Sequence, residues 1–175
     1  MIFIACPHFK ISIRQRSKGQ SAVAGAAYQA GENLFSEYDL KMKRYRYKLP
    51  EVKHKEILLP SNAPPEYKDR QTLWNAAERV EKQWNAQLSR GMVMALPREL
   101  PDEQYASLVR DYCMEQFVSK GMCCDFAIHD KGDGNPHAHI MLTMRAMDEN
   151  GKWLPQGKKD LRAGRERREN PTSQR

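Results

Sequence analysis

The sequence has no long hydrophobic run: none of its apolar stretches approaches the roughly 20 residues that a membrane-spanning helix needs. The N-terminus also lacks the basic segment and apolar stretch that mark a secretory signal. We therefore expect a cytoplasmic protein without membrane insertion.

Cysteine is scarce, and the four cysteines lack the CxxC spacing of zinc and redox sites. We expect reduced, packed thiols, with the adjacent Cys123 and Cys124 on opposite faces of a sheet.

Acidic residues are scarcer than basic ones: 22 Asp and Glu stand against 29 Lys and Arg, a formal net charge of +7. This balance favours a polyanionic partner such as nucleic acid. Over residues 39–49, basic side chains alternate with tyrosines, so an exposed arm there would follow a phosphate backbone and stack on bases. A solvated hairpin fits the same pattern. The predicted DNA contacts are Arg14, Arg16, Lys18, Lys41, Lys43, Arg44, Tyr45 and Arg46.

Strand and helix patterns alternate along the chain, which favours an α+β sheet with helices on one face. The first strand is expected in the centre of the sheet, beside the last hairpin. In the helix expected over 66–88, apolar side chains recur every three and four residues, so Trp84 and Leu88 should be buried. The predicted strands are 2–14, 54–59, 91–96 and the two arms of the hairpin 122–145, and the predicted helices are 22–33, 66–88 and 101–120.

Three of the five histidines lie within the predicted hairpin 122–145, whose turn is residues 130–135. Side chains two residues apart share a face, so His137 and His139 point the same way. If His129 lies opposite His137, the three imidazoles converge, with opposed Cβ atoms about 5 Å apart. Such a set binds one metal ion and leaves coordination positions open, although imidazole alone does not select among Zn, Mn, Fe, Ni and Cu.

Tyr28 is the only large side chain in a helix of small residues, which begins after the candidate N-cap Ser21. The small residues would let this helix lie close to a sheet or to nucleic acid. A phenol is a nucleophile when a metal ion or a base activates it. A half-buried helical tyrosine with a solvated hydroxyl is the commoner case, so the residues alone leave both roles open.

Four segments closely resemble the MobA/MobL (MobQ-type) conjugative relaxases of the HUH endonuclease superfamily. They are GQSAVAGAAYQAGENL, EILLPSNAPPEYKDRQTLWNAAERVEK, NAQLSRGMVMALPREL and IHDKGDGNPHAHIMLTMR, and they occur in the family's order. The resemblance implies a five-stranded antiparallel sheet flanked by helices, of the ferredoxin-like or palm-like type. It also implies a relaxase domain over about 1–150, followed over 151–175 by a charged tail or the start of a C-terminal region.

The resemblance further implies a bacterial enzyme that nicks one strand at a plasmid transfer origin. Tyr28 would be the nucleophile and would form a 5′-phosphotyrosyl adduct. His129, His137 and His139 would bind a divalent ion, Mg²⁺ or Mn²⁺ in the cell and also Zn, Ni or Co in vitro. The implied partners are the single-stranded and hairpin DNA of the origin, with accessory relaxosome and coupling proteins.

One departure from the family pattern leaves the general base unassigned. Relatives are expected to carry an acidic residue near the tyrosine, after Ala-Arg, whereas this chain has Gly91 after Ser89 and Arg90. Glu78, Glu81 and water are the candidate substitutes.

Three alternative functions remain open at this point. A rolling-circle replication initiator or a transposase shares the chemistry, but its tyrosine normally follows the His-x-His motif, and no tyrosine follows Tyr112 here. A small-molecule metallohydrolase would not need Tyr28. A non-enzymatic DNA-binding accessory protein would not need the histidines.

Overall fold

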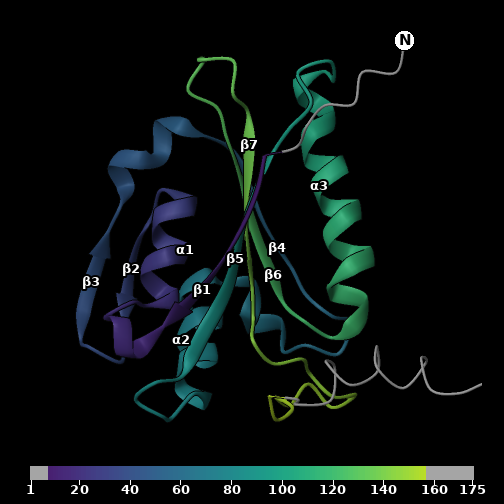
Figure 1. Cartoon of the computed structure of the whole chain (residues 1–175). Helices are drawn as coiled ribbons and strands as arrows, with labels where there is room; N and C mark the ends of the chain where they lie inside the picture. Colours follow the sequence, from purple (N-terminus) through teal and green to yellow (C-terminus); the bar gives the residue numbers. More distant parts are fainter. Residues whose placement is uncertain (1–7, 157–175) are drawn as a thin grey trace, which may run out of the picture.

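The computed structural model describes residues 8–156, which form a five-stranded antiparallel sheet with helices on both faces (Figure 1). The strand order is β1-β5-β7-β6-β4, and a separate hairpin of β2 and β3 lies outside α1. The predicted α+β class and five-stranded antiparallel sheet are confirmed. The strands are β1 (Phe9–Gln15), β2 (Asn33–Ser36), β3 (Lys41–Arg44), β4 (Val52–Leu58), β5 (Gln87–Ala95), β6 (Cys124–His129) and β7 (His137–Leu142).

Three α-helices and four short 3-10 helices connect these strands in the described part of the chain. None of these helices is long and apolar enough to cross a membrane. The α-helices are α1 (Ala22–Ala30), α2 (Arg70–Val80) and α3 (Asp102–Gln116), and the 3-10 helices are η1 (Arg16–Lys18), η2 (Arg46–Glu51), η3 (Pro65–Lys68) and η4 (Val118–Lys120).

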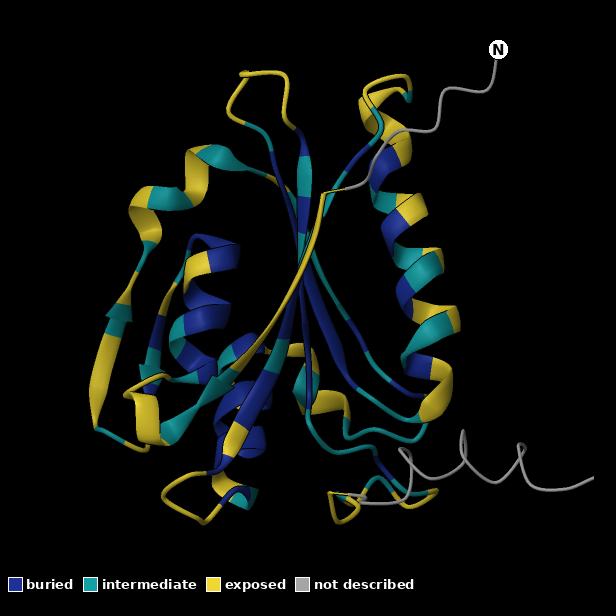
Figure 2. Cartoon of the chain, viewed as in Figure 1, coloured by how far each residue is buried: buried dark blue, intermediate teal, exposed yellow. Residues whose placement is uncertain are grey.

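The two central strands β6 and β7 are buried on both faces (Figure 2). On one face, Cys123 and Met141 pack with α1 and α2, and on the other, Phe126 and Ile140 pack with α3. The expectation that helices cover one face only is therefore wrong, because each apolar face of the central strands needs its own cover. Cys123 and Cys124 lie on opposite faces as predicted, and both are buried, free thiols.

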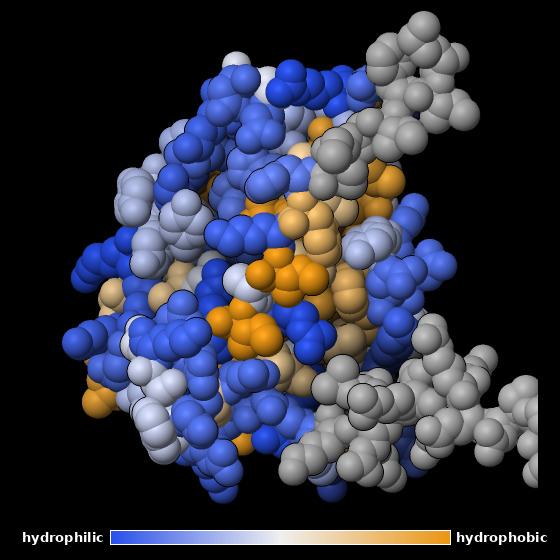
Figure 3. Space-filling view, in the orientation of Figure 1, coloured by the Kyte–Doolittle hydropathy of each residue, from blue (hydrophilic) through white to orange (hydrophobic). Residues whose placement is uncertain are grey.

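β1 lies at the edge of the sheet and pairs only with β5, so the prediction of a central first strand is wrong. Its apolar side chains are too exposed for a central strand: Phe9, Ile11 and Ile13 are 44%, 57% and 40% exposed. Figure 3 shows apolar side chains at the surface over β1. β5 takes the place beside the histidine strand β7, and residues 1–7 of the predicted strand lie outside the described part.

α2 ends at Val80 instead of continuing to Leu88. The carbonyl groups of Glu78 in its last turn, and of Glu81 and Gln83 just after it, accept hydrogen bonds from the Arg16 guanidinium, which ends the helix from outside. Trp84 consequently falls in the following loop and is 75% exposed, so its predicted burial is wrong. Leu88 is buried as predicted, but in β5.

Packing continues past residue 150. Met147 and Trp153 form an isolated β-bridge, and the Trp153 ring stacks on Tyr67 with ring centroids 5.6 Å apart. The predicted tail over 151–175 therefore begins with residues that pack against the domain, and residues 157–175 lie outside the described part.

A buried ion pair joins α2 to the central strand β6. Asp125 is fully buried and accepts hydrogen bonds from Arg70 Nε at 2.8 Å, Arg70 Nη2 at 2.9 Å and Trp74 Nε1 at 2.9 Å. Its backbone carbonyl accepts from Gln29 Nε2 at 3.0 Å, which adds α1 to the same anchor. Arg70 also reaches Glu32 at 2.8 Å, so the buried cation is fully paired.

Replacing Asp125 with Ala leaves the Arg70 charge and the Trp74 N–H buried without their partner. We expect Asp125→Ala to lower the free energy of unfolding by about 3–5 kcal/mol, measured by urea denaturation. The matched control is Glu37→Ala, which breaks the exposed pair with Arg79 and should cost no more than about 1 kcal/mol. Equal losses in the two variants would show that the Asp125 cluster does not anchor α2.

Candidate metal centre and nucleophile

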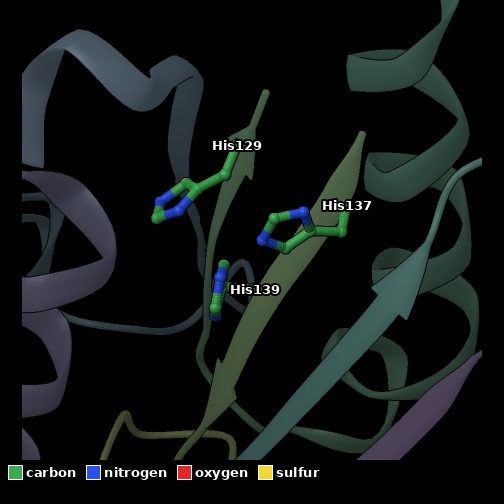
Figure 4. A group of neighbouring side chains, drawn as sticks. All are labelled: His129, His137 and His139. Atoms are coloured by element: carbon green, nitrogen blue, oxygen red, sulfur yellow. The ribbon is translucent and has the colours of Figure 1, made fainter. Parts of the chain in front are cut away.

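The three histidines meet at one end of the β6–β7 hairpin, in the predicted register. His129 pairs with His137, and Ala127 pairs with His139. One ring nitrogen from each histidine lies within 4.8 Å of the other two, close enough for a single ion. Figure 4 shows the three rings turned toward one another from adjacent strands. In the described part of the chain this is the only cluster of three or more metal-ligating side chains.

Hydrogen bonds to carbonyl groups orient two of the rings. His129 Nε2 lies 2.6 Å from the Gln29 carbonyl oxygen, and His137 Nδ1 lies 2.8 Å from that of Asn135. A carbonyl oxygen only accepts, so each of these nitrogens carries the proton. This assignment leaves a free lone pair on Nδ1 of His129 and on Nε2 of His137. Metal-binding histidines usually donate their other ring N–H to a carbonyl or carboxylate group in this way.

Burial favours the neutral form of two of the imidazoles. The pKa of His139 is lowered to about 3, chiefly by desolvation and also by the neighbouring His129, His137 and Arg14. Desolvation also lowers the pKa of His129. A metal ion binds only the neutral form, so the donor set suits a divalent cation at neutral pH.

Tyr28 is the one exposed residue of α1, at 37% exposure. Its ring centroid lies 6.3 Å from that of His139 and 5.6 Å from that of Tyr45, edge-on in both cases. The next residue, Gln29, holds His129 through its carbonyl group. One turn of α1 thus carries the predicted nucleophile and orients a predicted metal ligand.

Two of the predicted DNA contacts, Arg14 and Arg16, pack against other parts of the protein. Arg14 lies beneath the helix, where a Cβ on Gly25 would come within 2.3 Å of its guanidinium, so any larger residue would displace this side chain. Its Nη1 atom is buried without a hydrogen-bond partner among the described residues. Arg16 binds the end of α2 and covers the Tyr38 ring at 4.2 Å, beside a cavity of about 380 Å³.

The remaining predicted DNA contacts lie outside α1, on the hairpin and the segments beside it. Lys43 is bound to Asp39, and the Tyr45 ring packs on Tyr28. The exposed cations of the set are Lys18, Lys41, Arg44 and Arg46.

Neither carboxylate suggested as a substitute base lies at the tyrosine. Glu78 accepts hydrogen bonds from Ser21 Oγ at 2.8 Å and from the first N–H groups of α1, which also confirms Ser21 as the N-cap. Tyr28 lies six residues further along α1 than Ala22, about 9 Å along the helix axis. Glu81 forms an ion pair with Arg145 at 2.6 Å. Both carboxylates are therefore engaged by other partners.

Position 91 lies beside Arg14. Gly91 pairs with Ser12 and Met141, and a Cβ built on it would lie 3.0 Å from Arg14 Nη1 and 3.0 Å from Ser12 Oγ. A carboxylate at this position would therefore reach the unpartnered guanidinium nitrogen.

Sequence analysis missed four residues that shape this site. Gln29 and Asn135 orient histidine rings, and Lys48 and Glu51 lie beside Tyr28 and His129. Each acts through a contact with a residue distant in the sequence or through its backbone carbonyl group. Neither kind of contact can be recognised from a sequence pattern.

The lowered pKa of His139 makes the stability of the metal-free protein depend on pH. Between pH 6.5 and about 3, the unfolded state binds a proton that the folded state rejects, so stability falls as pH falls. With chelator present, we expect a loss of up to about 1.4 kcal/mol per pH unit, measured by urea unfolding. His139→Asn should flatten this dependence, and His54→Asn, outside the cluster, should not. Parallel curves for wild type and His139→Asn would contradict the assignment.

A carboxylate at position 91 should pair with Arg14. We expect Gly91→Glu to be more stable than the isosteric Gly91→Gln by about 1.5–3 kcal/mol at pH 7, because a charge-assisted hydrogen bond forms only in the first. Thermal and urea unfolding of the two variants measure the difference, which should shrink as acid protonates the new carboxylate. Identical stabilities would mean that the new side chain turns away from Arg14.

Comparison with known proteins agrees with this site. A model of the MobA/MobL family matches residues 20–175. Conjugal transfer protein TraA of Agrobacterium fabrum is 38% identical over 158 residues, which are 85% of this chain and 14% of that protein. Probable mobilization protein MobA of Bifidobacterium longum is 35% identical over 153 residues, 86% of this chain and 27% of that protein. The chain thus spans less than a third of either relative.

A solved structure supports the same relationship. It is titled "Molecular Basis of Vancomycin Resistance Transfer in Staphylococcus aureus" and is 32% identical in sequence. It matches with a TM-score of 0.80, over 88% of this chain and 78% of its own. From the family match, the relatives and this shared fold, the chain belongs to the MobA/MobL family.

Proposed function

We propose that this domain is a plasmid-mobilisation relaxase that nicks one DNA strand at a transfer origin by transesterification at Tyr28. The observation that carries the proposal is the position of Tyr28, exposed and 6.3 Å between ring centroids from His139, beside three convergent imidazoles. The relatives are named as conjugal transfer and mobilisation proteins, which supports DNA as the substrate.

The Tyr28 oxygen attacks phosphorus in line, and the bond from phosphorus to the 3′-oxygen breaks. The products are a 5′-phosphotyrosyl link and a 3′-hydroxyl. The phenol proton passes to solvent, which reaches this exposed side chain, and the 3′-oxygen takes a proton from water. The reaction exchanges one phosphodiester for another, so the 3′-hydroxyl can reverse it.

A divalent ion on His129, His137 and His139 would offset the negative charge that develops on the phosphate oxygens. Burial lowers the pKa of His129 and His139 and so favours their neutral form, and Gln29 and Asn135 hold two of the rings in place. We propose Mg²⁺ or Mn²⁺ as the physiological ion, while Zn, Ni or Co would bind three imidazoles more tightly in vitro.

Exposed cations would bind the DNA backbone. Lys41 and Arg44 lie on β3, on the side of the molecule that carries α1, and Lys18 and Arg46 are further exposed cations. Phosphate contacts of this kind fix the register of DNA, while base contacts and hairpin shape give specificity. The proposed partners are the single-stranded and hairpin DNA of the origin, with accessory relaxosome and coupling proteins.

Removal of the phenol oxygen should abolish covalent attachment. We expect wild type, incubated with Mn²⁺ and single-stranded origin DNA, to give a slower band on denaturing electrophoresis, and Tyr28→Phe to give none. The matched control is Tyr38→Phe, at an exposed tyrosine on Arg16, which should keep the adduct.

Other outcomes of the same experiment would reject the proposal. Cleavage without a protein adduct, unchanged in Tyr28→Phe, would identify a nuclease that uses metal-activated water. Tight binding with neither cleavage nor adduct would identify a DNA-binding accessory protein.

A further inference from the structure

The segment η2 crosses directly over the C-terminus of α1. α1 ends at Gly31, whose φ of 62° lies in the left-handed region, and a Cβ there would come within 2.7 Å of Leu49 Cα and N. Only glycine allows this approach of the two backbones. The crossing places the residue before Leu49, Lys48, beside Tyr28.

The Lys48 side chain is half-buried and is held by an ion pair with Glu51. Its Nζ lies 5.2 Å from the centroid of the Tyr28 ring and 3.2 Å from both carboxylate oxygens of Glu51, and 16% of the side chain is exposed. The Glu51 carbonyl group accepts a hydrogen bond from Asp130 N at 3.0 Å, immediately after His129. The pair therefore joins η2 to the strand end that carries a metal ligand.

Lys48 has the positive charge and a remaining N–H donor with which to bind an anion. An ammonium group has three N–H donors, and Glu51 takes two of them. The Glu51 carboxylate and the nearby Tyr28 raise the pKa of Lys48, so it stays protonated at neutral pH and does not act as a base. In this half-buried position its charge is screened less than those of the exposed Lys41 and Arg44.

We propose that Lys48 is a further catalytic residue, whose ammonium group contacts a non-bridging oxygen of the phosphate that Tyr28 attacks, while Glu51 orients it. This inference rests on the proposed transesterification. In that step the bond from Tyr28 oxygen to phosphorus forms, the bond to the 3′-oxygen breaks, and water takes and returns the proton. Lys48 keeps its protons and offsets the charge that grows on the phosphate.

The test separates the rate of adduct formation from the affinity for DNA. The variants are Lys48→Gln, Lys48→Arg and the control Lys120→Gln, an exposed lysine on η4. Single-turnover adduct formation is measured with Mn²⁺ at saturating origin DNA, and affinity by fluorescence anisotropy. Circular dichroism melting checks the fold of each variant.

We expect Lys48→Gln to lower the saturating rate about 10²–10³-fold, as loss of one transition-state donor does, with affinity changed less than about threefold. Lys48→Arg should recover at least a tenth of the wild-type rate, because it restores the charge. Lys120→Gln should change neither the affinity nor the saturating rate. This pattern would support the proposal.

Three outcomes would overturn it, and they are distinguishable. If wild type forms the adduct, Tyr28→Phe does not, and Lys48→Gln retains the saturating rate, Lys48 is not catalytic and the proposed function stands. If wild type forms no adduct, the proposed function fails and the role of Lys48 fails with it. A folded Lys48→Arg variant as slow as Lys48→Gln would also reject a role for the charge.

Discussion

The carboxylate of Asp125 is buried on a central strand and must be neutralised, and the groups that neutralise it position the face that carries the three histidines. An unpaired charge at this depth would cost several kcal/mol, so the fold supplies Arg70 and the Trp74 indole from α2. The Asp125 carbonyl group also receives Gln29 from α1. Gln29 in turn accepts from His129, so one cluster fixes α2, α1 and a ring of the histidine site.

The small residues of α1 also affect the electrostatics of the histidine site. Because Gly25 lets α1 lie directly on Arg14, a positive charge is held beneath the helix with Nη1 unpartnered. This charge helps to keep His139 neutral, and burial also lowers the pKa of Arg14 itself. A face that carries the neutral His139, Arg14 and Lys48 suits the proposed anionic substrate and the cation that would assist its cleavage.

The part of the site that the sequence predicted correctly is local. The β6–β7 register follows from period-two alternation and a polar turn, so His129, His137 and His139 could be brought together from the residues alone. The position of Tyr28 beside them depends on how α1 packs on the sheet, which the sequence predicted only through the family resemblance.

The errors arise where tertiary contacts override local patterns. Trp84 continues a helical stripe, but Arg16 ends α2 four residues earlier from a distant segment. Likewise, the apolar residues of β1 indicate a strand without indicating an edge, because neighbours in the sheet are decided by the other strands. In the sequence, Lys48 is one more basic residue of the segment 39–49. Its position beside Tyr28 depends on the close approach of the Leu49 backbone to Gly31, which no sequence pattern indicates.

The most direct test of this account is anomalous X-ray diffraction from crystals of the protein loaded with Co²⁺. The account predicts one strong peak bound by Nδ1 of His129, Nε2 of His137 and a ring nitrogen of His139, with the carbonyl hydrogen bonds of Gln29 and Asn135 retained. A peak elsewhere, or coordination through Nε2 of His129 with the Gln29 contact broken, would contradict the claim that α1 prepares the metal centre.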